Sequence, residues 1–193
     1  MTRTTGAIEG RQTREFPVLL DAARAGDESA FAELYRDLNP RLVRYLRVVA
    51  GDGAEDLAAE TWMDVVRGWH RFAGDQTGFR AWLFTIARRR SIDACRAAAR
   101  RPLVAAGDDR IAELAAPGDA ESATEEALST EAALQLLRAL PADQAGVLAL
   151  RVIAGLDVAE VARVLRKRPG TIRVQAHRGL RALAEILGDR REL

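Results

Sequence analysis

The chain has 193 residues, 30% of them charged, and a net charge of +1, a size that allows one large or two small domains with cores of their own. Its single cysteine excludes an intrachain disulfide and a cysteine-based metal cluster, and its two histidines lack the spacing of a metal pair. No 18 apolar residues follow one another, and the N-terminus lacks the apolar core of a signal peptide. We therefore expect a cytoplasmic protein with no membrane insertion, no metal and no cofactor.

The first ordered part of the chain reads as a series of amphipathic helices after a flexible N-terminus over residues 1–15. The pattern predicts one or two helices over residues 16–38, with Asp27 as the N-cap of the second. Asn39 and Pro40 predict a break, and a further amphipathic helix is expected over residues 41–50.

A long helix predicted over residues 54–72 carries its acids in the first half, where the helix dipole favours negative charge. Asp56, Glu60 and Asp64 repeat every four residues, so they lie along one face. From composition alone, a solvated face combined with the dipole effect is the favoured explanation. The alternative is that this ridge of acids meets a positively charged partner.

A basic helix is predicted over residues 79–101. Six basic residues stand against one acid, Asp93, within 14 positions. They are Arg88, Arg89, Arg90, Arg96, Arg100 and Arg101. A helix of this kind can serve a membrane surface, RNA or DNA. The aromatic residues at its start, upstream of the arginines, fit the core better than they fit stacking on unpaired bases; they are Phe79, Trp82 and Phe84.

The segment that follows is acidic and has no sustained periodicity. Residues 1–102 carry 17 basic and 14 acidic residues, residues 103–133 carry one and eight, and residues 134–193 carry 11 and six. Alanine-rich and interrupted by Pro117 and Gly118, the segment fits a flexible linker, with boundaries predicted at residues 103 and 132.

Two amphipathic helices are predicted between Asp157 and Leu187. The expected inward stripe of the second contains Ile172, Ala176, Leu180, Leu183 and Leu187. Between the helices, Pro169 and Gly170 predict a tight turn, after which Thr171 is expected to cap the second helix. A short helix, a tight turn and a longer helix make a helix-turn-helix, whose second helix such motifs lay in the DNA major groove.

The outward face of the second helix suits base reading, because no acid lies on it before Glu185. Arginine can read guanine, glutamine can read adenine, and an exposed valine can touch a thymine methyl. The alternative is a helical hairpin with a solvated basic face. The residues expected to contact DNA are Arg168, Thr171, Arg173, Val174, Gln175, His177, Arg178 and Arg181.

Four pieces of the chain together resemble a known family. In order, they are FAELYRDLNPRLVRYL, AEDLAAETWMDVVRGW, FRAWLFTIARRRSIDACR and LPADQAGVLALRVIAGLDVAEVARVLRKRPGTIRVQAHRGL. They are similar to regions 2 and 4 of the extracytoplasmic-function (ECF) sigma factors of bacterial RNA polymerase, over roughly residues 16–102 and 133–188. The resemblance implies an all-α fold: a region 2 helical bundle over 16–102, the linker over 103–132, and a region 4 helix-turn-helix domain over 133–193.

The resemblance also implies partners and site residues. The acidic helix would dock on the largest subunit of core RNA polymerase through Asp56, Leu57, Glu60, Thr61 and Asp64. The basic helix would recognise the minus-ten promoter element and hold the melted strand through Arg88, Arg89, Asp93, Arg96 and Arg100. The helix-turn-helix would read the minus-thirty-five element, and an anti-sigma factor would hold the protein inactive.

Two departures from the family pattern bear on specificity. Arg89 stands where many members have asparagine, which favours a phosphate contact at this position. Val174 and Gln175 replace a common serine and arginine, so we expect a different minus-thirty-five sequence. The linker would either thread through the basic channel by which the RNA leaves or act only as a solubilising tether, and the sequence favours neither.

We therefore expect a promoter-specificity subunit without catalysis of its own, monomeric when free. No Ser/His/Asp or Cys/His set, no phosphate-cradling glycine loop and no carboxylate cleft is visible. The alternatives are a stand-alone helix-turn-helix repressor or activator, in which residues 16–102 sense a ligand or dimerise, and an RNA-binding or nucleic-acid-processing enzyme.

Overall fold

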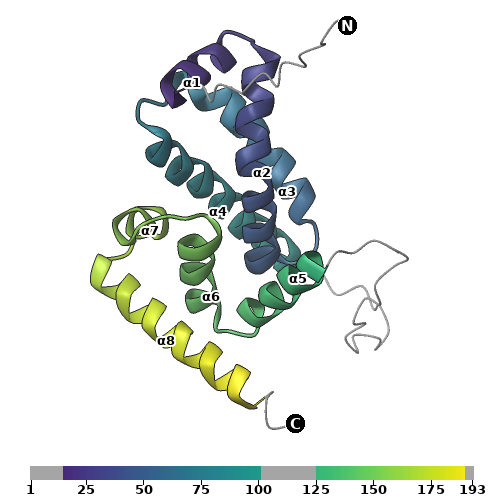
Figure 1. Cartoon of the computed structure of the whole chain (residues 1–193), viewed down its shortest axis with the longest axis vertical. Helices are drawn as coiled ribbons and strands as arrows, with labels where there is room; N and C mark the ends of the chain where they lie inside the picture. Colours follow the sequence, from purple (N-terminus) through teal and green to yellow (C-terminus); the bar gives the residue numbers. More distant parts are fainter. Residues whose placement is uncertain (1–14, 101–124, 190–193) are drawn as a thin grey trace, which may run out of the picture.

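The computed structural model describes residues 15–100 and 125–189, and every regular element in these ranges is helical. The first half contains α1 (Phe16–Arg24), α2 (Glu28–Ala50), α3 (Ala54–Gly68), the short 3-10 helix η1 (Trp69–Arg71) and α4 (Gln76–Arg100). The second half contains α5 (Glu125–Arg138), α6 (Ala142–Leu148), the π turn η2 (Ala149–Ile153), α7 (Val158–Leu165) and α8 (Pro169–Asp189). The predicted all-α fold is confirmed (Figure 1).

Helix α2 is continuous, although Asn39 and Pro40 predict a break. Proline removes one backbone donor and disfavours the helical conformation of the residue before it. Here the apolar stripe on both sides of the proline is buried against the rest of the first half, including Leu38 and Leu42. Packing of one continuous face therefore outweighs the local cost.

At the start of α2, Asp27 accepts hydrogen bonds from the backbone amides of Ser29 and Ala30, so its predicted role as N-cap is confirmed.

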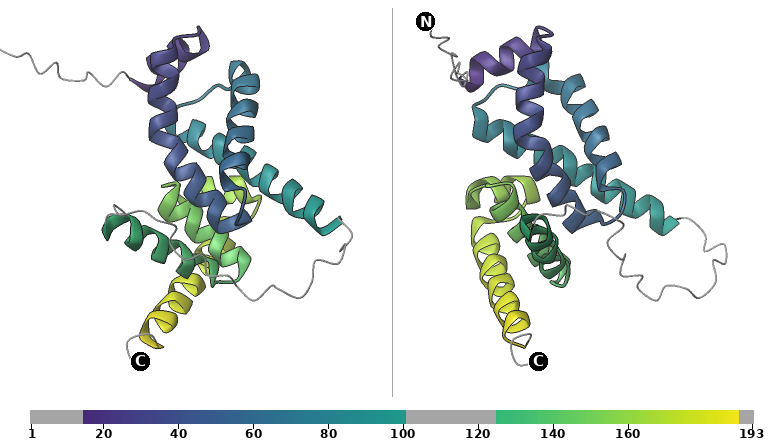
Figure 2. Two further views of the ribbon diagram at one scale, coloured as in Figure 1. Left: turned by 90° about the vertical axis from the view of Figure 1, so that its right-hand side faces the viewer. Right: turned by 45° about the vertical axis from the view of Figure 1, so that its right-hand side comes forward.

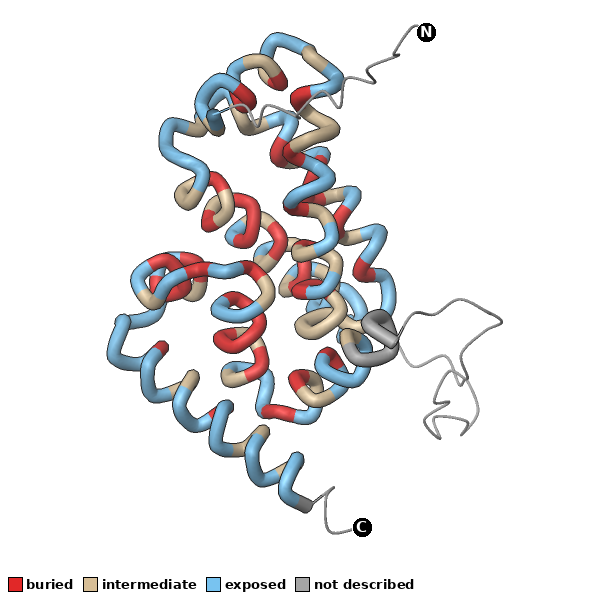
Figure 3. The backbone as a smooth tube through the Cα atoms, in the orientation of Figure 1, coloured by how far each residue is buried: buried red, intermediate tan, exposed pale blue. Residues whose placement is uncertain are grey.

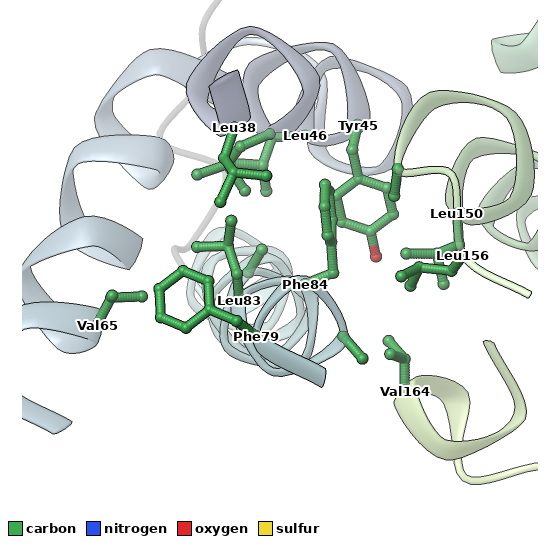
Figure 4. Close-up of a cluster of buried hydrophobic side chains, with 14 of the residues drawn as sticks. Leu38, Tyr45, Leu46, Val65, Phe79, Leu83, Phe84, Leu150, Leu156 and Val164 are labelled. Atoms are coloured by element: carbon green, nitrogen blue, oxygen red, sulfur yellow. The ribbon is translucent and has the colours of Figure 1, made fainter. Parts of the chain in front are cut away.

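The two halves lie against each other and share one apolar core. Tyr45 of α2 and Phe84 of α4 point toward Leu150, Leu156 and Val164 of the second half (Figure 4). All five side chains are buried, and Figure 3 shows the buried residues lining the inner faces of the helices in both halves. A polar contact adds to this interface, because Arg138 Nε donates to the carbonyl oxygen of Arg47 at 2.8 Å.

The linker predicted over residues 103–132 lies partly outside the described residues, which leave out 101–124. Its last eight residues, 125–132, belong to α5 rather than to an extended tether. The predicted boundary between residues 132 and 133 therefore falls inside a helix. The expected flexible N-terminus over residues 1–15 also lies outside the description, apart from Glu15.

Candidate functional site

The acidic ridge of α3 lies at the surface, but its members differ in what they can offer a partner. Asp56 is exposed, whereas Leu57, Glu60 and Asp64 are half-buried. Thr61 is fully buried, and its hydroxyl donates to the carbonyl oxygen of Leu57. As placed, Thr61 cannot contact another protein, which corrects its inclusion among the docking residues. Thr61 follows Glu60 directly in the sequence, so its side chain lies about 100° further around the helix and faces the core.

An arginine of α4 reaches across to this ridge. Arg90 donates through Nε to Asp64 Oδ2 at 2.7 Å and through NH1 to Glu60 Oε2 at 3.0 Å. The NH2 group also lies 2.6 Å from Asp64 Oδ2. The hydrogen bond with Asp64 raises the pKa of the Arg90 guanidinium. The positive partner of the ridge is therefore, in part, internal to the chain.

An exposed apolar strip that was not predicted from the sequence adjoins the acids. Met63 and Val66 are 48% and 42% exposed on α3, and Ala59 is exposed on the same helix. Positions 59, 63 and 66 follow the spacing of one helix face. The signal was present as the i, i+4, i+7 pattern, but a sequence alone does not tell which apolar stripe of a helix is the buried one.

On α4, four of the five residues predicted to contact the minus-ten element form one stripe. Arg89, Asp93, Arg96 and Arg100 are spaced by four, three and four residues, which places them on one face, and all four are exposed. Arg89 and Asp93 form a loose intrahelical pair at 3.9 Å. Arg88 lies about 100° around the helix from Arg89 and is half-buried.

Arg88 instead faces a crevice of about 490 Å³ between the two halves of the chain. Arg96 also lines it, so the stripe of α4 borders this crevice. Its other walls include Tyr45, Cys95, Asp143 and Lys167.

The predicted structural role of Trp82 agrees with its packing, because its ring stacks on Phe72 with centroids 5.3 Å apart.

The helix-turn-helix comprises α7 and α8. Asp157 and Glu160 form a capping box that starts α7, and Arg166 ends the helix in the left-handed conformation at φ 53°. α8 begins at Pro169, a favoured first position because proline's fixed φ suits a helix start. Thr171 therefore lies inside α8, and its predicted role as cap is wrong.

The inward stripe of α8 is shifted from the one predicted. Ile172 is buried and Ala176 and Leu183 are half-buried as expected, but Leu180 and Leu187 are 56% and 46% exposed. Gly179 is buried in their place, and a Cβ added there would lie 2.9 Å from Leu148 Cδ1 of α6. Apolar periodicity predicts leucine inside, whereas the close approach of two helices here requires a residue without a side chain.

Seven of the eight residues predicted to contact the minus-thirty-five element are exposed. They are Arg168, Thr171, Arg173, Val174, His177, Arg178 and Arg181. The eighth, Gln175, is half-buried: its amide nitrogen donates to Asp143 of α6, and its amide oxygen accepts from Lys167 Nζ at 3.3 Å. To read a base, Gln175 must first leave Asp143.

The described residues contain no group of three side chains suited to hold a metal ion. Among the described helices none combines the length and apolarity that crossing a bilayer requires. The arrangement offers an exposed acidic and apolar face on α3 and exposed basic faces on α4 and α8.

Comparisons with known proteins agree on the family. The model of sigma-70 region 2 matches residues 34–101, and that of sigma-70 region 4 matches residues 130–183. The ECF RNA polymerase sigma factor ShbA of Streptomyces griseus is 36% identical, with 90% of this chain and 97% of ShbA covered. BldN of Streptomyces coelicolor, also an ECF sigma factor, is 35% identical over 89% of this chain, which spans 65% of the length of BldN.

Two solved structures share the fold. One is the sigma factor RpoE in complex with the anti-sigma factor NepR from Bartonella quintana, with a TM-score of 0.64 and 24% identity over 82% of this chain and 96% of that one. The other is CnrH in complex with the cytosolic domain of CnrY, with a TM-score of 0.62 and 20% identity over 90% and 97%.

Proposed function

Because the chain belongs to the sigma-70 family, as an ECF sigma factor with regions 2 and 4, we propose that it binds core RNA polymerase and directs it to promoters. In this role α3 docks on the polymerase, α4 engages the minus-ten element and assists melting, and α8 reads the minus-thirty-five element. The protein performs no catalysis of its own, acts in the cytoplasm and is monomeric when free.

One observation carries the proposal: the chain presents two separate basic faces, one on α4 and one on α8. Arg89, Arg96 and Arg100 are exposed on α4. Arg173, His177 and Arg178 are exposed on α8, where no acid lies before Glu185. Exposed arginines of this kind bind phosphates and read guanine. Two such faces in one chain suit a protein that contacts two DNA elements at once.

The docking face on α3 supports the polymerase contact. Asp56 is an exposed acid, and Met63 and Val66 add exposed apolar surface beside it. Interfaces commonly combine an apolar centre with a charged rim. We place the polymerase contact on Asp56, Leu57, Glu60 and Asp64 together with this apolar strip, and we leave out Thr61 because it is buried.

The packed arrangement has a consequence for promoter binding. The two elements lie about 25 base pairs apart, or roughly 85 Å at about 3.4 Å per base pair. Helix α8, by contrast, begins only four residues after α7, which packs directly against α4. The two halves must therefore separate to contact both elements, so the packed form is the resting state and the polymerase-bound form is open.

An anti-sigma factor is the expected regulator of this resting state. Each of the two solved structures contains a second protein: the anti-sigma factor NepR is bound to RpoE, and the cytosolic domain of CnrY is bound to CnrH. The crevice between the halves, with apolar walls and the cations Arg88, Arg96 and Lys167, is where a partner could hold both halves at once.

The test is binding to core RNA polymerase followed by transcription in vitro. The chain should form a 1:1 complex with core enzyme and support initiation from its own promoter in a reconstituted system. Binding of a palindromic operator by a dimer, without any complex with core enzyme, would instead favour a stand-alone helix-turn-helix regulator.

A further inference from the structure

Arg90 occupies a position on α4 that differs from that of its neighbours. Arg89 is exposed and Arg88 faces the crevice between the halves, whereas Arg90 points to α3 and binds two of its acids. Its three nitrogens make contacts of 2.6 to 3.0 Å with Glu60 and Asp64, which lie one helical turn apart. Arginine holds two carboxylates in this way because its guanidinium is a rigid planar fork.

Apolar contacts also join α3 and α4. Val65 of α3 meets Phe79 and Leu83 of α4 in the core (Figure 4). At the far end a Cβ added to Gly68 would lie 3.2 Å from the Trp82 ring. The hydrophobic attraction itself has no direction, and the packed side chains restrict the angle between the helices only through their shapes. The Arg90 fork adds directional polar contacts, and it lies at the end of the interface nearest the residues proposed to bind DNA.

Beyond Arg90, α4 leaves the core. Ser91 is the last buried residue of the helix, and Cys95 and all residues after it to Arg100 are exposed. Figure 2 shows this end of α4 projecting from the bundle. Arg100 lies ~15 Å beyond Arg90 at 1.5 Å per residue, so a tilt of about 20° at Arg90 displaces the end of the helix by roughly 5 Å. Misplacements of this size are enough to weaken a positioned contact.

We propose that Arg90 is a positioning residue, which holds Glu60 and Asp64 at once and thereby fixes the direction of the projecting half of α4 relative to the docking face of α3. The inference rests on the proposed function, because it assigns to Arg90 the alignment of the minus-ten contacts with the polymerase-bound helix. Arg90 itself need not touch DNA. Because Arg90 joins the two helices, the position of the DNA-contacting residues of α4 depends on the position of α3 on the polymerase.

The first experiment measures position and requires neither polymerase nor DNA. Spin labels are attached to Cys95, the single cysteine of the chain, and to a cysteine introduced on α3 by Ala59→Cys, both exposed positions. The distribution of label distances should be narrow in the otherwise unchanged chain. Arg90→Gln should broaden it by about 2–3 Å, the displacement that a tilt of about 20° gives five residues beyond the pivot.

Arg67→Gln is the matched control. Arg67 NH1 also pairs with Asp64, at 3.4 Å, but it lies on α3 itself and joins no second helix. Its replacement removes a salt bridge of the same acid and should leave the distance distribution unchanged. Arg90→Lys keeps the charge but loses the fork, so it should give an intermediate width. A distribution unaffected by Arg90→Gln overturns the proposal, whatever the protein does with polymerase.

The second experiment measures function in the polymerase complex. With core enzyme saturated, Arg90→Gln should lower the fraction of promoter opened, read by permanganate reactivity of unpaired thymines, by about tenfold. Arg67→Gln should stay within twofold. Both are compared well below the melting temperature of each variant, so that a stability difference alone cannot produce the loss. Full opening by Arg90→Gln, despite a broadened distance distribution, would overturn the functional half of the inference.

Discussion

Tyr45 packs against Phe84 edge to face, with ring centroids 5.3 Å apart and an interplanar angle of 89°. The pair joins α2 to α4 at the place where both helices meet the second half of the chain, and both side chains are fully buried. The same two rings thus belong to the core of the first half and also pack against Leu150 and Leu156 of the second half (Figure 4).

The first prediction concerns the ionisation of Tyr45. Burial raises the pKa of its hydroxyl well above the ordinary 10.0. Above pH 10 the unfolded chain releases this proton while the folded chain keeps it, so the free energy of unfolding should fall by ~1.4 kcal/mol per pH unit from this group alone. Tyr45→Phe should remove this slope when unfolding in urea is compared at pH 9 and pH 11.

Tyr35 supplies the control for that measurement, because it is 39% exposed. Tyr35→Phe removes a tyrosine hydroxyl but keeps Tyr45, so the slope contributed by Tyr45 should remain. Equal slopes for the Tyr45→Phe variant and the unchanged protein would contradict the burial of the Tyr45 hydroxyl.

The second prediction concerns the interface between the halves. A protease site inserted between residues 105 and 106 should yield two fragments that elute together from a sizing column after cleavage, because Leu150, Leu156 and Val164 remain buried against α2 and α4. Leu156→Asp places a charge in this core and should make the fragments elute separately. Separate elution without the substitution would mean that the linker alone holds the halves together.

The third prediction concerns the docking face. Asp56→Lys should reduce co-purification of core polymerase and change the free energy of unfolding by no more than about 0.5 kcal/mol, because an exposed helix charge contributes little to stability. Asp52→Lys is the control, since Asp52 is an exposed acid in the turn before α3. Glu60→Lys should cost more stability than Asp56→Lys, because it sets a second cation beside Arg90. Core enzyme recovered at full yield with Asp56→Lys would remove Asp56 from the interface.

The fourth prediction separates base reading from phosphate binding on α8. In the complex with polymerase, Arg178→Ala should cost roughly 1–3 kcal/mol at the preferred minus-thirty-five sequence and little on a scrambled one. Arg168→Ala, in the turn before α8, should weaken both alike and reduce the slope of log affinity against log salt by about one. Equal losses on both sequences for Arg178→Ala would assign that arginine to the backbone.

The fifth prediction concerns the close contact of α8 with α6. Gly179→Ala should lower the free energy of unfolding by about 1–3 kcal/mol, as other overpacked substitutions do, because its Cβ would meet Leu148 and Gln144 at 2.9 and 3.3 Å. Gly146→Ala on α6 is the matched substitution, since nothing lies within 4 Å of its Cβ. It should stabilise by roughly 0.5–1 kcal/mol, the helix preference of alanine over glycine. A stabilising Gly179→Ala would contradict the close approach.

Local signals in the sequence were reliable where a short stretch decides its own conformation. Asp27 caps α2 because a side-chain oxygen reaches amides two and three residues ahead, whatever the rest of the chain does. The break predicted at Pro40 was wrong because the local cost of a proline inside a helix is outweighed by burial of apolar residues along the whole of α2. That burial depends on residues distant in the sequence. The start of α8 shows the same limit: a turn was predicted at Pro169 and Gly170 with a cap at Thr171, but the helix begins at Pro169.

From the sequence alone we could predict the helical class, the acidic character of α3 and the basic character of α4 and α8, but not all of the elements, because α2 runs through the break predicted at Asn39 and Pro40 and α5 begins inside the predicted linker. Periodicity and charge are properties of neighbouring residues, so they can be read without coordinates. Which helix faces meet depends on the packing of the whole chain: Arg90 pairs with Glu60 and Asp64 across 26 or more positions, and Gly179 rather than Leu180 lies against α6. Such choices depend on distances between helices, and those distances are set by the packing of all the side chains at once.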